Sequence, residues 1–414
     1  MRKKHFLFAS VLALLCGSSA LHAQDFKLTS SGYFKNQGVD IMAFDDIYPE
    51  GHQGGVCIIM NGHRVATNGD IRLEATPGQW QPVPKQLDRK LGDNSITATL
   101  CYPDSSRHLT GFNPMIYPDL HLIYTVNVES KGKNIEVTVD LDRPIPQEFI
   151  GKVGFNLEFF PGSLFGKPWI MDGQSGIFPQ QPNSPLMTTQ PNYLHTGNYH
   201  DGKQSLADMD KLIGKGYSPI VADDIISEPY AKGRKFTSRP DDPYNKVTIE
   251  SLSGDLQLFD GRMNHNNGWF VLRSNIKPGV TKGAVKWIIT PNVVADWMYQ
   301  PVIQTSQIGY HPAQDKEAVI EMDIRDNRKE TAQIIRIDAD GEKVVKNVTP
   351  ANWGKFLRYN YLKVDFTDVK EPGLYKIKYD TSVSPIFRID NDVYARGVWQ
   401  PLSLIHISEP TRPY

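Results

Sequence analysis

The sequence predicts an all-β protein, with a large N-terminal β-sandwich domain followed by a small immunoglobulin-like β-sandwich. Polar and apolar residues alternate over many short runs, which is typical of strands with one buried face. The 29 prolines and 33 glycines are scattered between these runs, where turns are expected. The chain has 414 residues, which is more than one ordinary domain contains, so at least two domains are expected.

Composition excludes several classes of function. The chain is 40% hydrophobic and 22% charged, as folded globular proteins are, and its net charge is −1. A nucleic-acid partner is not expected, because no basic run or patch occurs in the sequence. No apolar run is long enough to cross a membrane, so no transmembrane segment is predicted. No phosphate-binding or cofactor motif occurs, and we predict no cofactor.

Residues 1–23 are predicted to be a cleaved secretory signal. Positive residues at 2–5 precede an apolar run at 6–15, and small residues lead to an expected cleavage after Ala23. The mature protein is therefore expected to be secreted or periplasmic. Cys16 raises the alternative of a lipoprotein, but the residue before it is not small, so lipid anchoring is the less favoured interpretation.

Two cysteines, Cys57 and Cys101, remain after this cleavage. An even number of cysteines in an exported protein permits one disulfide. Both lie in strand-like apolar runs, so the bond requires these strands to be neighbours. Two buried free thiols are the alternative, and the sequence leaves both open.

Residues 24–300 are predicted to form the large sandwich. The clearest element is a hairpin at 126–141, where two alternating runs flank a turn at 131–134. Residues 155–159 alternate in the same way. Further strands are expected at 247–250, 256–258, 268–272 and 285–290. So many strands require two packed sheets to bury them.

One helix is predicted, at residues 205–214. Ser205 is a suitable N-cap, with Asp208 three residues on as the acidic partner of a capping box. Gly214 follows the last apolar position and ends the helix.

Residues 161–200 are predicted to be an irregular stretch rich in aromatic residues, and such stretches in compact domains are usually functional. A sugar ring has an apolar C–H face and a rim of hydroxyls, so aromatic rings with nearby carboxylates and amides suit it. The candidate glycan contacts are Trp169, Asp172 and Gln174 in this stretch, and His265 and Trp269 in a second polar segment. The alternative is that these aromatics pack in the sandwich core, which is the commoner role of large aromatic side chains.

Residues 301–390 are predicted to form the small sandwich. Short strand-like runs occur at 317–322, 331–337, 362–366, 374–379 and 386–389. Turn signals, such as Asp340-Gly341 and Pro372-Gly373, separate them. About 90 residues with this texture are typical of an immunoglobulin-like sandwich.

This small domain resembles the cellulase N-terminal immunoglobulin-like domain of glycoside hydrolase family 9 enzymes. The resemblance lies in Gln307-Ile308-Gly309-Tyr310-His311-Pro312 with Lys316, and in the segments 364–368, 372–377 and 384–389. It implies a parent enzyme that hydrolyses β-linked glucans such as cellulose or xyloglucan with inversion, in an α/α barrel that follows the small domain. The implied partners are a polysaccharide or oligosaccharide and that catalytic domain.

No catalytic residue and no metal ligand is predicted in the chain itself. The Asp-Ala-Gly-Asp motif that the resemblance implies for the catalytic base is absent from the sequence, and the histidines lack metal-ligand spacing. Residues 391–401 are expected to begin the linker or first helix of the barrel. Residues 402–414 look like a translated sequencing adapter. We therefore expect an inactive N-terminal fragment.

Two other functions stay open. The first is a stand-alone exported glycan-binding or scaffold protein, which a natural sequence up to Tyr414 would favour. The second is a mutarotase-like enzyme in the large domain, using His and acidic residues of the 161–267 region. It rests on the size and strand length of that domain alone, and a fold does not fix a function.

Overall fold

The computed structural model describes residues 25–45, 54–73, 84–102, 120–183, 186–188, 225–263, 268–356 and 358–395. These residues form antiparallel strands with short 3-10 turns, which confirms the all-β prediction. The chain divides into two compact units, residues 1–296 and 297–414, called the large unit and the small unit below. The helix predicted at 205–214 lies outside the described residues.

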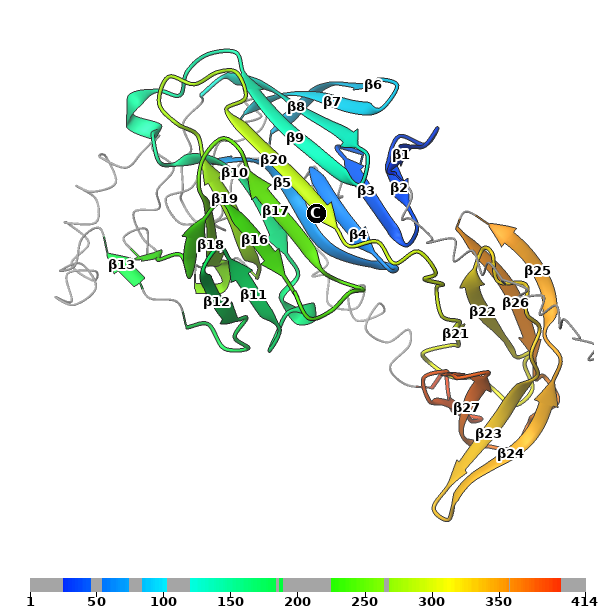
Figure 1. Cartoon of the computed structure of the whole chain (residues 1–414). Helices are drawn as coiled ribbons and strands as arrows, with labels where there is room; N and C mark the ends of the chain where they lie inside the picture. The colour runs from blue at the N-terminus through cyan, green and yellow to red at the C-terminus, as the bar shows by residue number, and fades with distance from the viewer. Residues whose placement is uncertain are drawn as a thin grey trace, which may run out of the picture. The chain divides into compact units, whose positions relative to one another are not determined.

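The large unit contains two nine-stranded antiparallel sheets (Figure 1). The first sheet has the order β1 (Lys27–Leu28), β2 (Phe34–Asn36), β3 (Val39–Ala43), β4 (Val56–Met60), β5 (His63–Leu73), β10 (Val153–Phe159), β19 (Phe270–Asn275), β18 (Leu256–Asp260) and β15 (Ala231–Gly233). The second has the order β12 (Gln174–Ile177), β11 (Pro168–Met171), β16 (Lys235–Ser238), β17 (Val247–Ser251), β20 (Val285–Pro291), β9 (Asn134–Leu141), β8 (Leu122–Lys131), β7 (Ser95–Tyr102) and β6 (Lys85–Leu91). A separate pair is formed by β13 (Leu186–Thr188) and β14 (Ile225–Ser227).

One hydrophobic core joins the two sheets of the large unit. The Phe155 ring of β10 meets the Trp287 ring of β20 edge-on, with 5.0 Å between ring centroids, and Phe159 meets Phe236 at 5.8 Å. Burial alternates along β7, β8 and β9, so every second residue faces the core. Each fully buried large apolar side chain contributes about 1.5–3 kcal/mol to folding, which makes this interface the main source of the unit's stability.

The predicted hairpin at 126–141 is confirmed as β8 and β9. Lys131 pairs with Asn134 across the turn, as the alternation predicts. Gly132 in the turn has φ +71°, a conformation that glycine adopts without steric cost. Its carbonyl accepts the backbone N–H of Phe26 at 2.9 Å, so the turn is also bonded to the segment before β1.

The prediction of an irregular stretch at 161–200 is wrong for its first part, because β11 and β12 form a tight hairpin there. The connection is Asp172-Gly173, and Asp172 takes the left-handed conformation with φ +49°. These strands are only four residues long, and β12 is largely exposed. Short strands with one polar, solvent-facing member leave no alternation that a sequence pattern can detect.

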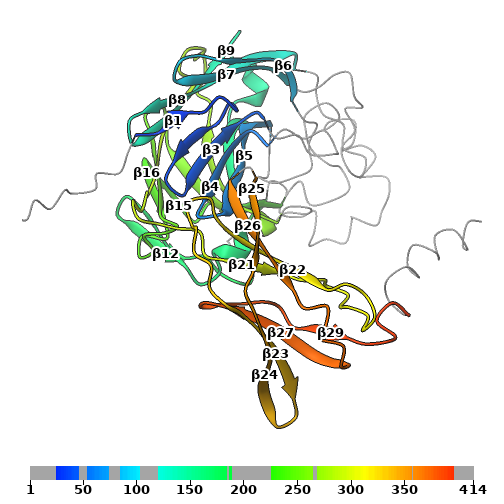
Figure 2. The same ribbon diagram turned by 90° about the vertical axis from the view of Figure 1, so that its right-hand side faces the viewer.

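The small unit is a sandwich of two sheets (Figure 2). One has the order β21 (Val302–Gln304), β22 (Glu317–Asp323), β26 (Tyr359–Asp365) and β25 (Ala351–Phe356). The other contains β24 (Gly341–Val348), β23 (Ala332–Asp338), β27 (Gly373–Tyr379) and β28 (Ser382–Val383), and β29 (Phe387–Ile389) also pairs with β27. The strands predicted for this unit are all present. The strands β21, β24, β25 and β28 were not predicted.

Tyr310 stands at the centre of the small unit's core. Its ring packs edge-on against Phe366 and Phe387, with centroids 5.1 Å and 5.3 Å away. Its hydroxyl donates to the Glu317 carbonyl at 2.9 Å and accepts the Ser306 N–H at 3.0 Å. Phenylalanine at this position would leave the Glu317 carbonyl and the Ser306 N–H without this partner.

Candidate functional site

The structure brings three of the predicted glycan contacts, Trp169, Asp172 and Gln174, together on the β11–β12 hairpin. Trp169 is buried, at 6% exposure. The Asp172 carboxylate accepts the backbone N–H groups of Arg234 and Lys235 at 2.7 Å and 3.1 Å. The Gln174 side chain donates to the Lys232 carbonyl at 2.6 Å. These polar groups hold the neighbouring β15–β16 turn against the hairpin.

A buried ion pair lies beside Trp169. The Trp169 ring is 6.4 Å from the Tyr230 ring, and the Tyr230 hydroxyl donates to the Asp260 carboxylate at 2.9 Å. Arg262 donates to both oxygens of Asp260, at 2.8 Å and 2.9 Å. Its guanidinium also lies 4.6 Å from the centre of the Phe270 ring. Asp260 is fully buried, so removing Arg262 would leave an unpaired charge in the protein interior.

The remaining two predicted contacts belong to a different part of the chain. Trp269 lies just before β19, is half-buried, and packs edge-on against Phe160 with 4.5 Å between centroids. Its carbonyl accepts the Gly261 N–H at 2.9 Å. His265 lies outside the described residues. Gly261 follows Asp260, so Trp269 adjoins the end of the strand that carries the buried ion pair.

A row of polar side chains lies on the outer face of β5, β10 and β19, and sequence reasoning missed it. Phe155, Leu157 and Phe159 of β10 face the core, so Asn156 and Glu158 face the other way. Both are nevertheless buried, at 0% and 5% exposure. The alternation of residues 155–159 is typical of a strand with one buried face and one solvent-facing face. The sequence pattern is the same when the polar face is also buried, so it could not indicate this burial.

Each member of this row has a partner within it. The Arg273 guanidinium, itself 2% exposed, donates to Asn156 at 2.7 Å and to the Lys152 carbonyl at 2.5 Å. Asn68 donates to the Glu158 carboxylate at 2.6 Å from a β-bulge in β5. A lone arginine in the apolar strand β19 is the one signal in the sequence that could have indicated a covered polar face.

Asp70 is a second buried acid in the large unit. The Tyr124 hydroxyl donates to one of its oxygens at 2.8 Å, and the other oxygen has Arg72 at 3.7 Å but no hydrogen bond. Burial raises the pKa of Asp70 to about 6, because desolvation outweighs the favourable charge of Arg72 and the hydrogen bond from Tyr124.

No disulfide joins Cys57 and Cys101 in the structure. Cys57 lies in β4 of the first sheet and Cys101 in β7 of the second. The two strands are not neighbours, which is the arrangement that the possible disulfide required. The Cys57 thiol is buried and donates to the Gly54 carbonyl at 2.9 Å.

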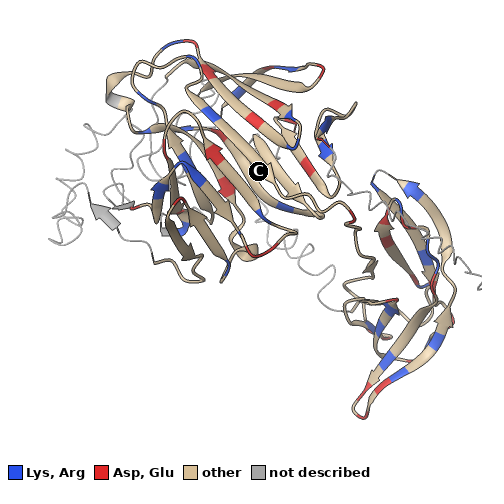
Figure 3. Ribbon diagram, viewed as in Figure 1, with Lys and Arg blue, Asp and Glu red and all other residues tan. Residues whose placement is uncertain are grey.

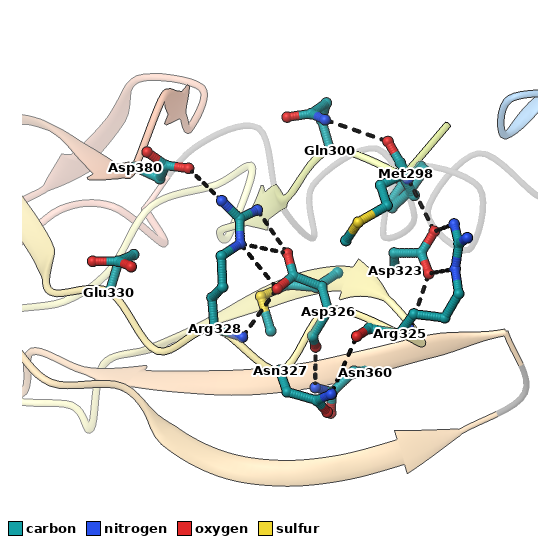
Figure 4. Close-up of polar contacts among 12 residues, drawn as sticks. Met298, Gln300, Asp323, Arg325, Asp326, Asn327, Arg328, Glu330, Asn360 and Asp380 are labelled. Atoms are coloured by element: carbon teal, nitrogen blue, oxygen red, sulfur yellow. Dashed lines mark hydrogen bonds and ion pairs between the residues drawn. The ribbon is translucent and has the colours of Figure 1, made fainter. Parts of the chain in front are cut away.

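Two aspartate–arginine pairs organise one end of the small unit (Figure 4). Arg325 donates to both oxygens of Asp323 at 2.8 Å, and the Tyr299 N–H adds a third bond at 3.0 Å. Burial alone would raise the pKa of Asp323, but these hydrogen bonds outweigh it and hold the pKa at about 2. Arg325 also donates to the Trp297 carbonyl at 2.6 Å, so the pair fastens the segment before β21 to the sandwich.

The second pair lies in the same loop, which follows β22. Arg328 donates to both oxygens of Asp326 and, at 3.0 Å, to Asp380 (Figure 4). The Asn360 side chain donates to the Asp326 carbonyl at 2.8 Å. Arg328 therefore ties the loop after β22 to the β27–β28 turn, and the two sheets of the sandwich are joined by charge as well as by the core.

The described residues contain no group of three or more His, Cys, Asp or Glu that could hold a metal ion. Over the same residues, no helix has the length and hydropathy of a membrane span. Basic and acidic residues both occur along the strands of each unit (Figure 3).

Comparison with known proteins assigns the small unit. Residues 298–384 match the family model of the cellulase N-terminal ig-like domain, which confirms the resemblance seen in the sequence. Among solved structures, a metagenome-derived glycoside hydrolase family 9 endoglucanase is 31% identical, with 22% of this chain and 18% of that chain covered and a TM-score of 0.20. The chain thus spans less than a fifth of that relative.

A second solved structure is described as HI1317. It is 9% identical, covers 64% of this chain and 98% of its own, and has a TM-score of 0.26. Among curated proteins, none matches the chain.

Proposed function

We propose that this chain is a non-catalytic accessory region of an exported cellulase-like glycoside hydrolase that cleaves β-linked glucans such as cellulose or xyloglucan. The observation that carries the proposal is the match of residues 298–384 to a domain type defined by its place at the N-terminus of cellulases. In this proposal the small unit braces the catalytic domain, and the signal-like residues 1–23 direct the protein to the periplasm or the exterior.

The construction of the small unit supports a bracing role. A domain that positions another must hold its own surface fixed, and paired charges add directional restraints to a packed core. The Asp323–Arg325 and Asp326–Arg328 pairs supply such restraints at the strand connections. The family's chemistry needs two carboxyl groups on opposite sides of a sugar ring, and we assign no such couple to the described residues.

For the large unit we propose a glycan contact, with Trp269 as its test residue. Of the predicted contacts that the structure describes, Trp169 is the most buried, and Asp172 and Gln174 are bonded to backbone. Trp269, which is half-buried, is the less buried of the two tryptophans. A ring of this kind can stack on the apolar face of a sugar.

The proposal is tested by measuring reducing ends after the full chain is incubated with carboxymethylcellulose, xyloglucan, mixed-linkage β-glucan and chitosan. We expect no release above buffer from any of them. Turnover that co-purifies with the chain would show that it holds an active site of its own. The Glu158→Gln variant then serves as the matched control, because Glu158 is the buried carboxylate on the outer face of β10.

A further inference from the structure

The small unit presents a row of aromatic rings on the outer face of its β21–β22–β26–β25 sheet. Along β26, Asn360, Leu362 and Val364 are buried, so Tyr359 and Tyr361 between them face outward. The row, called the aromatic face below, consists of Trp297, Tyr299, Tyr359, Tyr361 and Trp353.

Neighbouring rings of the aromatic face are in contact. Their centroids are separated by 6.3 Å, 5.1 Å, 6.1 Å and 5.6 Å in the order just given. The Trp353 ring lies edge-on to Tyr361 at a β-bulge in β25, and its side chain is 59% exposed. A large aromatic side chain that is this exposed does not contribute the free energy that its burial would give. Contiguous exposed apolar patches of this kind mark interaction sites.

One carboxylate lies within the row and is built into it. Glu321 of β22 is opposite Tyr361 in the strand register. It accepts the Tyr299 hydroxyl at 2.9 Å and the Tyr361 hydroxyl at 3.2 Å. Both tyrosine hydroxyls are thereby committed as donors, and their oxygen lone pairs remain acceptors. The face thus combines apolar rings with fixed acceptor oxygens.

Two carboxylates of this face are paired with cations, Asp323 with Arg325 and Glu317 with Lys363 at 2.6 Å. Glu321 keeps its charge, but its oxygens are occupied by the two tyrosine hydroxyls. A face whose charges are mostly paired offers little electrostatic gain to a polyanion or to a basic partner. The complementary ligand is neutral, with apolar faces for the rings and hydroxyl donors for the acceptor oxygens.

We infer that the aromatic face binds a neutral β-linked glucan chain. A glucan chain carries equatorial hydroxyls around apolar C–H faces, which is the combination that this surface matches. The choice of a β-glucan rests on the proposed function, whereas the neutral polyhydroxyl character follows from the face itself. The small unit then holds substrate in addition to bracing a catalytic domain.

The inference is tested with the full chain and regenerated amorphous cellulose in a depletion assay, with cellohexaose titration as the soluble counterpart. We expect Trp353→Ala to weaken binding about tenfold, as loss of a principal aromatic contact does. Tyr361→Phe keeps the ring and should cause a smaller loss. Tyr244→Ala, which removes an exposed tyrosine of the large unit, is the matched control and should bind as the original chain does.

Three outcomes would overturn the inference. One is no retention of the unmodified chain on cellulose. Another is equal binding by the Trp353→Ala variant while Trp269→Ala loses binding, which would place the glycan on the large unit. The last is a dimer that Trp353→Ala converts to a monomer in light scattering, which would make the face a self-association surface. None of these three outcomes depends on the release of sugar. The proposed function is therefore judged separately, by the reducing-end assay.

Discussion

At the scale of single residues, Gly309 shows how closely the first and last parts of the small unit approach. Its φ is +104°, and a Cβ at this position would collide with the Arg388 carbonyl oxygen. The next residue, Tyr310, donates its N–H to that same carbonyl at 2.8 Å and accepts the Asp390 N–H at 3.0 Å. The glycine of the Gln-Ile-Gly-Tyr-His-Pro string is therefore required by a parallel bridge between Tyr310 and Ile389.

We predict that Gly309→Ala lowers the free energy of unfolding of the small unit by more than about 2 kcal/mol, because strain and collision act together. Gly341→Ala is the matched control. Gly341 also has a positive φ, +126°, but a Cβ there meets nothing within 4 Å, so only strain of about 1 kcal/mol is expected. Hydrogen exchange of the small unit measures both. Equal effects of the two substitutions would contradict the collision.

Asp70 makes the stability of the large unit depend on pH. Its folded pKa of about 6 lies above the ordinary value of 3.8, so the folded state disfavours the ionised form. The stability that this group contributes is complete below pH 3.8 and is lost as pH rises through about 6. The expected loss between these limits is about 3 kcal/mol.

We predict that Asp70→Asn removes this part of the pH dependence, since the amide still accepts the Tyr124 hydroxyl but does not ionise. Thermal unfolding followed between pH 4 and 7 measures it. Asp140→Asn, which changes a partly exposed aspartate of β9, should keep the original pH slope. If the Asp70→Asn variant kept the original dependence of thermal stability on pH, Asp70 would not titrate in this range.

At the scale of elements, the strand connections of the small unit depend on buried carboxylates. Asp323 has its pKa lowered to about 2, so its ion pair with Arg325 stabilises the fold above pH 3.8 and is lost as pH falls towards 2. We predict that Asp323→Asn lowers the stability of the small unit by about 2 kcal/mol at pH 7. Hydrogen exchange at pH 7 measures the loss in the segment before β21.

The control is Asp338→Asn, which breaks the more exposed pair with Arg336 at the end of β23. An exposed pair is worth roughly 0–1 kcal/mol, so a small effect is expected. If both substitutions had the same effect, burial would not be what gives the Asp323 pair its strength.

The sequence predicts those elements whose two faces differ. The hairpin β8–β9 alternates between core and solvent, and its turn residues are visible as well. By contrast, β24 and β25 are exposed on both faces and carry no informative alternation. The alternation of β10 predicts the strand, but it does not indicate that both faces of the strand are buried. The buried polar row and the aromatic face escaped prediction because they depend on pairing between strands distant in sequence, such as Glu321 with Tyr299 and Tyr361.

At the scale of the whole molecule, each unit has its own hydrophobic core, and the two core clusters share no residue. Units with separate cores unfold separately when few contacts join them. We predict two transitions in differential scanning calorimetry of the full chain. Gly309→Ala should lower the temperature of one transition and leave the other in place. A single transition that moves as a whole would contradict this independence.

Residues 341–356 have a consequence for the behaviour of the protein at high concentration. They supply β24 to one sheet and β25 to the other, and each is the outermost strand of its sheet. Outermost strands offer unpaired backbone groups to other chains and so invite aggregation. Here the run carries Lys343, Lys346 and Lys355, whose charges oppose the approach of a like strand. Replacing these lysines with neutral residues would remove this charge protection from both outermost strands.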